Sequence, residues 1–147
     1  MLDRGQIGRA FPPFSVTLEA GRLRFFAKAI GETDPVYLDE AAARAAGHRS
    51  LPAPPTFLFA LEQEQPDPWA WLQEVGLDLK KVLHGEQAFS YHRVPTAGET
   101  LTFAARIKDI YDKKGGALEF LVKEVAVTDA AGAPVAELTT TIVQRNA

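Results

Sequence analysis

Residues 54–61 read Pro-Pro-Thr-Phe-Leu-Phe-Ala-Leu, and this stretch decides the fold. Pro54 and Pro55 favour a helix start, because proline already has the backbone angle of a first helical turn. Residues 57–61 are apolar on every side, which is typical of a helix enclosed by the rest of the protein. We therefore predict one buried central helix, with Glu62 to Gln65 carrying the chain out into solvent.

The residues before this helix have mainly a helical pattern. It predicts a short strand at 14–18 and helices at 22–30 and 40–46; a further short helix is expected at 67–76, after the central helix. The second helix is well delimited, because Asp39 is a good N-cap and Gly47 suits the position after the last turn.

The residues after the central helix alternate between apolar and polar from about Gln87 onward, which indicates strands. The alternation that starts at Leu101 breaks at Ile110, so we expect a bulge near Asp109. Strands are expected to begin near residues 87, 101, 118 and 135, with tight turns at 113–116 and 129–134. Helices first and strands later predict an α+β fold, in which a curled antiparallel sheet wraps around one long apolar helix. This is the plan of the hot-dog fold.

The composition narrows the possible functions. A length of 147 residues suits a single domain, 1–147, that buries a sizeable core. The formal net charge of -3 gives no reason to expect nucleic acid or an anionic membrane as partner. The absence of cysteine excludes disulfides, thiolate catalysis and cysteine-ligated zinc. No apolar run approaches about 18 residues and no leader is evident, so we expect a soluble, cytoplasmic protein.

Residues 31–39, Gly-Glu-Thr-Asp-Pro-Val-Tyr-Leu-Asp, lie between two predicted helices. Proline disfavours the helical backbone in the residue before it, so Asp34-Pro35 breaks the chain here. If this stretch has only a structural role, it is the loop of a helix–loop–helix unit. Asp34 then forms an Asx turn, and Tyr37 packs with its hydroxyl hydrogen-bonded.

The same stretch resembles the signature of the MaoC-like enoyl-thioester hydratases and dehydratases, G-D-x-N-P-I/L-H-x-D. Gly31, Pro35 and Asp39 match that pattern. Glu32 stands in place of the family's catalytic aspartate, and Tyr37 in place of its catalytic histidine. Asp34 replaces an asparagine and remains a candidate substrate-binding residue.

Four segments extend the resemblance over nearly the whole chain and make it most similar to the FAS1-like N-terminal subgroup. They are 34–37, 53–57, 82–87 and 95–99. This subgroup includes non-catalytic subunits of heterodimeric (3R)-hydroxyacyl-thioester dehydratases. Ala53-Pro54-Pro55-Thr56 stands where catalytic members have alanine-histidine-glycine. The resemblance implies a dimer with acyl tunnels near the subunit interface.

The chemistry that the resemblance implies needs a base for the C2 proton and an acid for the departing C3 hydroxyl. Glu32 keeps the carboxylate but is one methylene longer, which matters for a group that must reach about 2.6–3.2 Å from the proton. A phenol such as Tyr37, with an ordinary pKa near 10, is a poor base at neutral pH. His84 is a third catalytic candidate. The substrate-binding candidates are Asp34, Pro54, Pro55, Thr56, Phe57, Gly85 and Gly98.

The remaining polar and aromatic residues give weaker indications. His48 lies near Arg44 and Arg49, a grouping that could hold phosphates of CoA or of phosphopantetheine. His92 is interpreted as a solvent-facing or dimer contact. Trp69 and Trp71 either cap an acyl tunnel or cover the sheet. No histidines and carboxylates have metal-ligand spacing, so we predict no metal.

The leading hypothesis is a dehydratase-type subunit that binds acyl-CoA or acyl-ACP and works beside a catalytic partner, without a cofactor. A second hypothesis is an autonomous homodimeric hydratase that uses Glu32 with Tyr37 or His84. A third is a non-enzymatic acyl-thioester-binding module.

Overall fold

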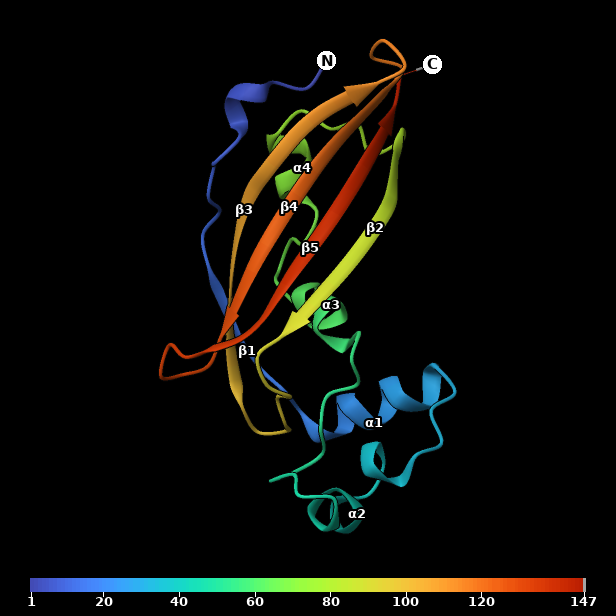
Figure 1. Ribbon diagram of the computed structural model, residues 1–147, viewed down its shortest axis with the longest axis vertical. Coiled ribbons are helices and arrows are strands. Elements are labelled where there is room, and N and C mark those ends of the chain that lie inside the picture. The colour runs from blue at the N-terminus through green and yellow to red at the C-terminus, as the bar shows by residue number, and fades with distance from the viewer. Residues whose placement is uncertain (147) are drawn as a thin grey trace.

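A computed structural model describes residues 1–146 and contains one five-stranded sheet. Its strands are β1 (Phe14–Thr17), β2 (Val82–Tyr91), β3 (Thr100–Lys113), β4 (Leu118–Thr128) and β5 (Pro134–Arg145). They lie in the order β1-β3-β4-β5-β2, and every neighbouring pair is antiparallel. Figure 1 shows the four long strands side by side, with β2 at one edge.

Six short helices accompany the sheet. They are the 3-10 helices η1 (Arg4–Gln6) and η2 (Pro35–Tyr37), and the α-helices α1 (Ala20–Ala29), α2 (Glu40–Ala45), α3 (Phe57–Glu62) and α4 (Ala70–Glu74). In Figure 1, α3 and α4 lie behind the sheet, whereas α1 and α2 lie beyond its lower end. None of the helices within residues 1–146 is long and apolar enough to cross a membrane.

The central helix packs its apolar side chains against the sheet, as the sequence predicts. Phe57, Leu58 and Leu61 are buried and share a core with Phe103 and Leu138 from the sheet. The helix is shorter than predicted, because it ends at Glu62 and turns follow from Gln63 to Gln65.

The expectation that Glu62 leads into solvent is wrong. Glu62 is 2% exposed, because its side chain points into the fold and forms an ion pair with Lys123 on β4. A pattern read along the helix could not show this, since Lys123 lies far away in sequence.

The strand predictions are mostly confirmed, including the bulge near Asp109, where the β3–β4 register shifts after Ile107. A second bulge lies between His84 and Glu86 on β2. This bulge interrupts the alternation of apolar and polar residues, which explains why the sequence predicts a strand start near Gln87 although β2 begins at Val82.

Candidate functional site

Glu32 closes the loop that follows α1. The loop turns at Gly31, whose φ of +75° lies in the region that favours glycine. The Glu32 side-chain oxygen Oε1 accepts hydrogen bonds from the backbone N–H groups of Thr33 at 2.8 Å and Asp34 at 2.9 Å. The carboxylate is therefore held by its own loop. We call residues 31–39 the motif loop.

Asp34 and Tyr37 form the next turn. The Asp34 carboxylate accepts a hydrogen bond from the Val36 N–H at 3.0 Å and caps η2, so the predicted Asx turn is present. Tyr37 ends η2, is half-buried, and donates its N–H to the Asp34 carbonyl at 3.1 Å. Asp39 then caps α2 through the Ala42 N–H at 2.8 Å.

We call residues 53–57 the proline-rich segment; it contacts both α1 and the end of β2. Pro54 is buried, and its carbonyl accepts the Phe57 N–H at 2.9 Å. The Phe57 ring packs edge-on against Phe26 of α1, with 5.1 Å between ring centroids. Thr56 is exposed and makes no capping hydrogen bond.

Tyr91, which was not among the predicted site residues, fixes this segment to the end of β2. Its hydroxyl donates a hydrogen bond to the Pro55 carbonyl at 2.6 Å. Burial raises the pKa of Tyr91 to about 12, because ionisation would place a charge in a poorly solvated position. The sequence carries no signal for this contact beyond the place of Tyr91 in an alternating strand.

The Gly98 turn lies beside the proline-rich segment. Ala53 donates its N–H to the Pro95 carbonyl, and Ala97 donates to the Leu51 carbonyl, both at 2.9 Å. Gly98 has a φ of +91° and donates its N–H to the Leu18 carbonyl at 2.7 Å. The structure thus brings together the predicted residues of segments 54–57 and 98.

His84 and Gly85 lie at the other end of the molecule, on the bulge of β2. His84 stacks on Phe59 with a centroid distance of 5.0 Å, and its Nε2 is 3.3 Å from Gln87 Oε1. In Figure 1 the start of β2 is at the upper end of the sheet, while α1 and α2, which flank Glu32 and Tyr37, lie below it. Within one chain, His84 is therefore not part of the loop that holds Glu32 and Tyr37.

Two of the three residues considered for phosphate binding, His48 and Arg49, line a shallow depression of about 380 Å³, and Arg44 is not among its lining residues. Arg93 also lines it, together with Glu99 and Asp129. Arg93 forms ion pairs with Glu99 at 2.6 Å and with Asp129 at 3.1 Å, so its charge is already compensated. His92 is exposed, with its Nε2 at 3.5 Å from Glu137 Oε1.

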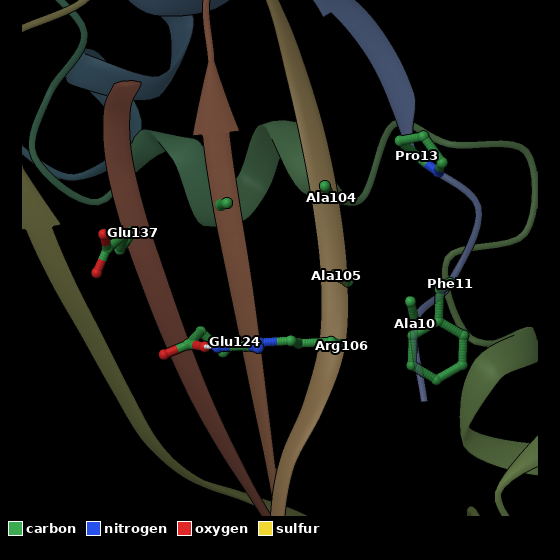
Figure 2. A pocket seen from close by; sticks show the side chains of 9 residues that line it. Ala10, Phe11, Pro13, Ala104, Ala105, Arg106, Glu124 and Glu137 are labelled. Carbon is green, nitrogen blue, oxygen red and sulfur yellow. Dashed lines mark hydrogen bonds and ion pairs between the residues drawn. The ribbon is translucent and has the colours of Figure 1, made fainter. Parts of the chain in front are cut away.

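Another depression, of about 570 Å³, lies on the outer face of the sheet, away from the motif loop. Figure 2 shows Ala104 and Ala105 on β3, beside Phe11 and Pro13 of the N-terminal arm. Arg106 reaches across to Glu124 at 2.6 Å, so the charged groups of this face pair with each other. The carboxylates that line the depression are both paired, Glu124 with Arg106 and Glu137 with His92. Within residues 1–146, no three His, Asp or Glu side chains gather closely enough to hold a metal ion.

Comparison with known proteins connects this architecture to a family. The chain matches a family model described as FAS1-like, dehydratase domain region, over residues 5–138. The UPF0336 protein of Saccharopolyspora erythraea is 37% identical over 146 residues, covering 98% of this chain and 92% of that protein.

Two solved structures share the fold. One chain of the C-terminally truncated HadBC complex of Mycobacterium tuberculosis, a 3R-hydroxyacyl-ACP dehydratase, superposes with a TM-score of 0.81 at 24% identity. That match covers 94% of this chain and 96% of the other. A chain of the ChsH1–ChsH2 complex of the same organism gives a TM-score of 0.73 at 24% identity, covering 93% and 84% of the two chains. The shared curled sheet confirms the hot-dog fold, and the chain belongs to the family described as FAS1-like, dehydratase domain region.

Proposed function

We propose that the protein is the acyl-thioester-binding subunit of a (3R)-hydroxyacyl-thioester dehydratase or enoyl hydratase. A partner chain that carries an intact aspartate and histidine pair performs the proton transfers. The substrate is an acyl-CoA or an acyl-ACP. Family membership supports this proposal, and so do the names of two structural neighbours, each a complex of two proteins.

The observation that carries the proposal is that the motif loop has Glu32 and Tyr37, with Glu32 hydrogen-bonded to the backbone of its own loop. Elimination across C2 and C3 needs a base that reaches the C2 proton and a group that protonates the leaving hydroxyl. Glu32 Oε1 is occupied by two backbone N–H groups of its own loop. Tyr37 brings a phenol where an imidazole would exchange protons near neutral pH, and a phenol does this poorly.

The part of this chain that would contact the thioester is the paired segments 53–57 and 95–98. They are joined by backbone hydrogen bonds and fixed to β2 by Tyr91. Phe26 ties them to α1, which leads directly into the Glu32 loop. Acyl binding can thus persist here although the proton-handling groups are replaced.

The partner would add a strand to the edge of β2. This ten-residue strand pairs only with β5 within residues 1–146, so its other edge can accept a neighbouring strand. Leu83 on this edge strand is 52% exposed, which suits a residue that becomes covered on assembly.

The test is co-expression with a MaoC-like chain that has the complete G-D-x-N-P-x-H pattern, followed by a crotonyl-CoA hydration assay. We expect background rates from this chain alone and turnover from the complex. Glu32→Gln and Tyr37→Phe are expected to change the turnover of the complex less than about threefold, because neither group transfers a proton.

Leu83→Lys is expected to separate the two chains in size-exclusion chromatography, since a lysine would be buried without a partner. Leu79→Lys is the matched control, because Leu79 is 45% exposed but precedes β2. Robust hydration by the isolated chain, abolished by Tyr37→Phe, would show that it is an autonomous hydratase instead.

A further inference from the structure

A polar row crosses the concave face of the sheet between two apolar layers. Lys123 on β4 pairs with Thr140 on β5, which in turn pairs with Gln87 on β2. Lys123 is 4% exposed and Thr140 is 2% exposed. The neighbouring rows on either side are apolar on β4 and β5: Val125 pairs with Leu138 in one row, and Leu121 pairs with Ile142 in the other.

The end of α3 faces this row and adds two polar side chains. Glu62 Oε1 lies 2.5 Å from Lys123 Nζ, and both side chains are almost completely enclosed. The Lys123 ammonium also lies 4.6 Å from the ring centroid of Trp71. We call Glu62, Gln63, Gln87, Lys123 and Thr140 the interior polar cluster.

Three buried atoms of the interior polar cluster have no hydrogen-bond partner among residues 1–146. They are Glu62 Oε2, Gln63 Oε1 and Gln87 Nε2. Gln87 Oε1, by contrast, accepts the Thr140 hydroxyl at 2.7 Å. Buried polar atoms are normally paired with protein groups or ordered water, so these two acceptors and one donor are available to a polar group that enters the cluster.

Small cavities adjoin the cluster on both sides of Lys123. One, of about 60 Å³, is lined by Phe59, Gln63, Trp69, Trp71, His84, Lys123, Thr140 and Ile142. The other, of about 40 Å³, lies beside Glu62, Trp71 and Phe103. The first has room for about two groups of the size of a water molecule. Exposed Trp69 and His84 mark where it approaches the surface.

Stability alone is a weak reason for a charged pair in this place. Replacing a buried ion pair by well-packed apolar residues is often neutral or stabilising, because burial removes both charges from water. Apolar residues would also extend the layers on either side without a break. The interior polar cluster therefore points to a ligand with its own polar group.

We propose that the interior polar cluster is the distal end of the acyl-binding space and selects short acyl groups with a terminal hydroxyl. This inference rests on the proposed function, because it assumes that the subunit binds acyl thioesters. A terminal hydroxyl would donate to Gln63 Oε1 or Glu62 Oε2, which no protein group within residues 1–146 satisfies. A longer alkyl chain would have to displace Lys123 from Glu62 and leave a buried charge unpaired.

Binding of three CoA thioesters tests this assignment: 6-hydroxyhexanoyl-CoA, heptanoyl-CoA and dodecanoyl-CoA. The first two differ by a hydroxyl in place of a methyl group, and the third adds length. Both tryptophans of the chain line the cavity, so their fluorescence reports its occupation, and calorimetry gives the Kd.

We expect the hydroxylated ligand to bind about tenfold more tightly than heptanoyl-CoA. We expect dodecanoyl-CoA to bind at least about 100-fold more weakly than heptanoyl-CoA. Any other order overturns the inference. If none of the three binds, the proposed function itself fails.

The double variant Glu62→Leu with Lys123→Met is expected to improve dodecanoyl-CoA binding at least about tenfold and to abolish the preference for the hydroxyl. Gln63→Leu leaves the ion pair intact and is expected to reduce the hydroxyl preference alone. The matched control, Glu124→Leu with Arg106→Met, removes an ion pair from the opposite face of the sheet and should keep the order. An order that none of these variants changes would contradict the role of the cluster.

Discussion

Glu32 keeps a local role in the fold even though it departs from the pattern of the catalytic relatives. The loop needs an acceptor for the N–H groups of Thr33 and Asp34, and any carboxylate of suitable length supplies one. Proton transfer makes a stricter demand, because the same oxygen would have to face the substrate. The hydrogen bonds to Thr33 and Asp34 therefore fix the shape of the loop without requiring that Glu32 transfers a proton.

Tyr91 provides a prediction that can be measured by titration. Its pKa is raised by burial to about 12, so the folded state favours the neutral phenol. This contribution to stability is complete below the ordinary pKa of 10.0 and is lost as the pH rises towards 12. Phenolate absorbance of the wild type minus that of Tyr91→Phe should show a midpoint close to this raised value.

Tyr91→Phe should also lower the free energy of unfolding at neutral pH by about 1 kcal/mol, because the Pro55 carbonyl loses its donor. Urea unfolding measures this change. A difference titration centred at the ordinary pKa of tyrosine would show that the side chain is solvated.

Single residues also show where the sequence is informative and where it is not. The turn at Asp34 is predictable, because its hydrogen bond joins residues two apart in the chain. Glu62 is not predictable, because its partner Lys123 comes from a strand formed much later in the sequence. The contact of Tyr91 with Pro55 is hidden for the same reason, since only the complete fold brings them together.

The elements follow a similar division. Alternation predicts β3, β4 and β5 well, because one face of each strand packs on the buried core. Alternation does not predict the start of β2, because the bulge beside Gly85 moves the following side chains to the other face of the sheet. The burial of Glu62 is also not predictable in this way, because a glutamate at the end of an apolar helix is normally expected to face solvent.

At the scale of the elements, the close approach of β2 and β5 at Gly85 can be tested by mutation. A Cβ atom at this position would lie 2.8 Å from Val143 Cγ2 and 3.2 Å from the Thr141 carbonyl oxygen. Gly85→Ala should therefore push β2 away from β5 and lower the free energy of unfolding by about 1–3 kcal/mol. Thermal unfolding followed by circular dichroism measures it.

Gly21→Ala is the matched control for Gly85→Ala. Gly21 lies in α1, and the space that an alanine Cβ would take there has no neighbouring atom within 4 Å. Alanine is the better helix former, so this variant should gain about 0.5–1 kcal/mol. Equal effects of the two alanines would show that the strands have room at Gly85.

On the scale of the whole molecule, the two ends of the sheet carry different elements. The lower end carries α1, α2 and the motif loop between them (Figure 1). The upper end carries the N-terminal residues, the end of β5 and a second apolar cluster, which includes Leu2, Leu121 and Ile142. The interior polar cluster lies between these halves, on the β4–β5 row that separates Leu121 from Val125.

Glu119 closes the upper end by holding both termini. The buried carboxylate accepts hydrogen bonds from the backbone N–H of Leu2, from Asn146 Nδ2 at 2.6 Å and from Gln144 Nε2 at 3.4 Å. Burial alone would raise the pKa of Glu119, but these donors, led by Asn146, outweigh it and lower that pKa below its ordinary 4.5. The resulting stabilisation is present above pH 4.5 and is lost as the pH falls through the lowered value.

Glu119→Gln should lower the free energy of unfolding at neutral pH by about 1–3 kcal/mol, because a neutral amide is a weaker acceptor for three donors. The variant should also lose less stability than the wild type when the pH falls below 4.5. Hydrogen exchange at Leu2 and over residues 144–146 should accelerate in the variant at neutral pH, while β3 near Phe103 stays protected. Glu86→Gln, on an exposed position of β2, is the control and should change none of these. Uniform acceleration along the whole chain would mean that the carboxylate supports the entire core rather than the closure of the two ends.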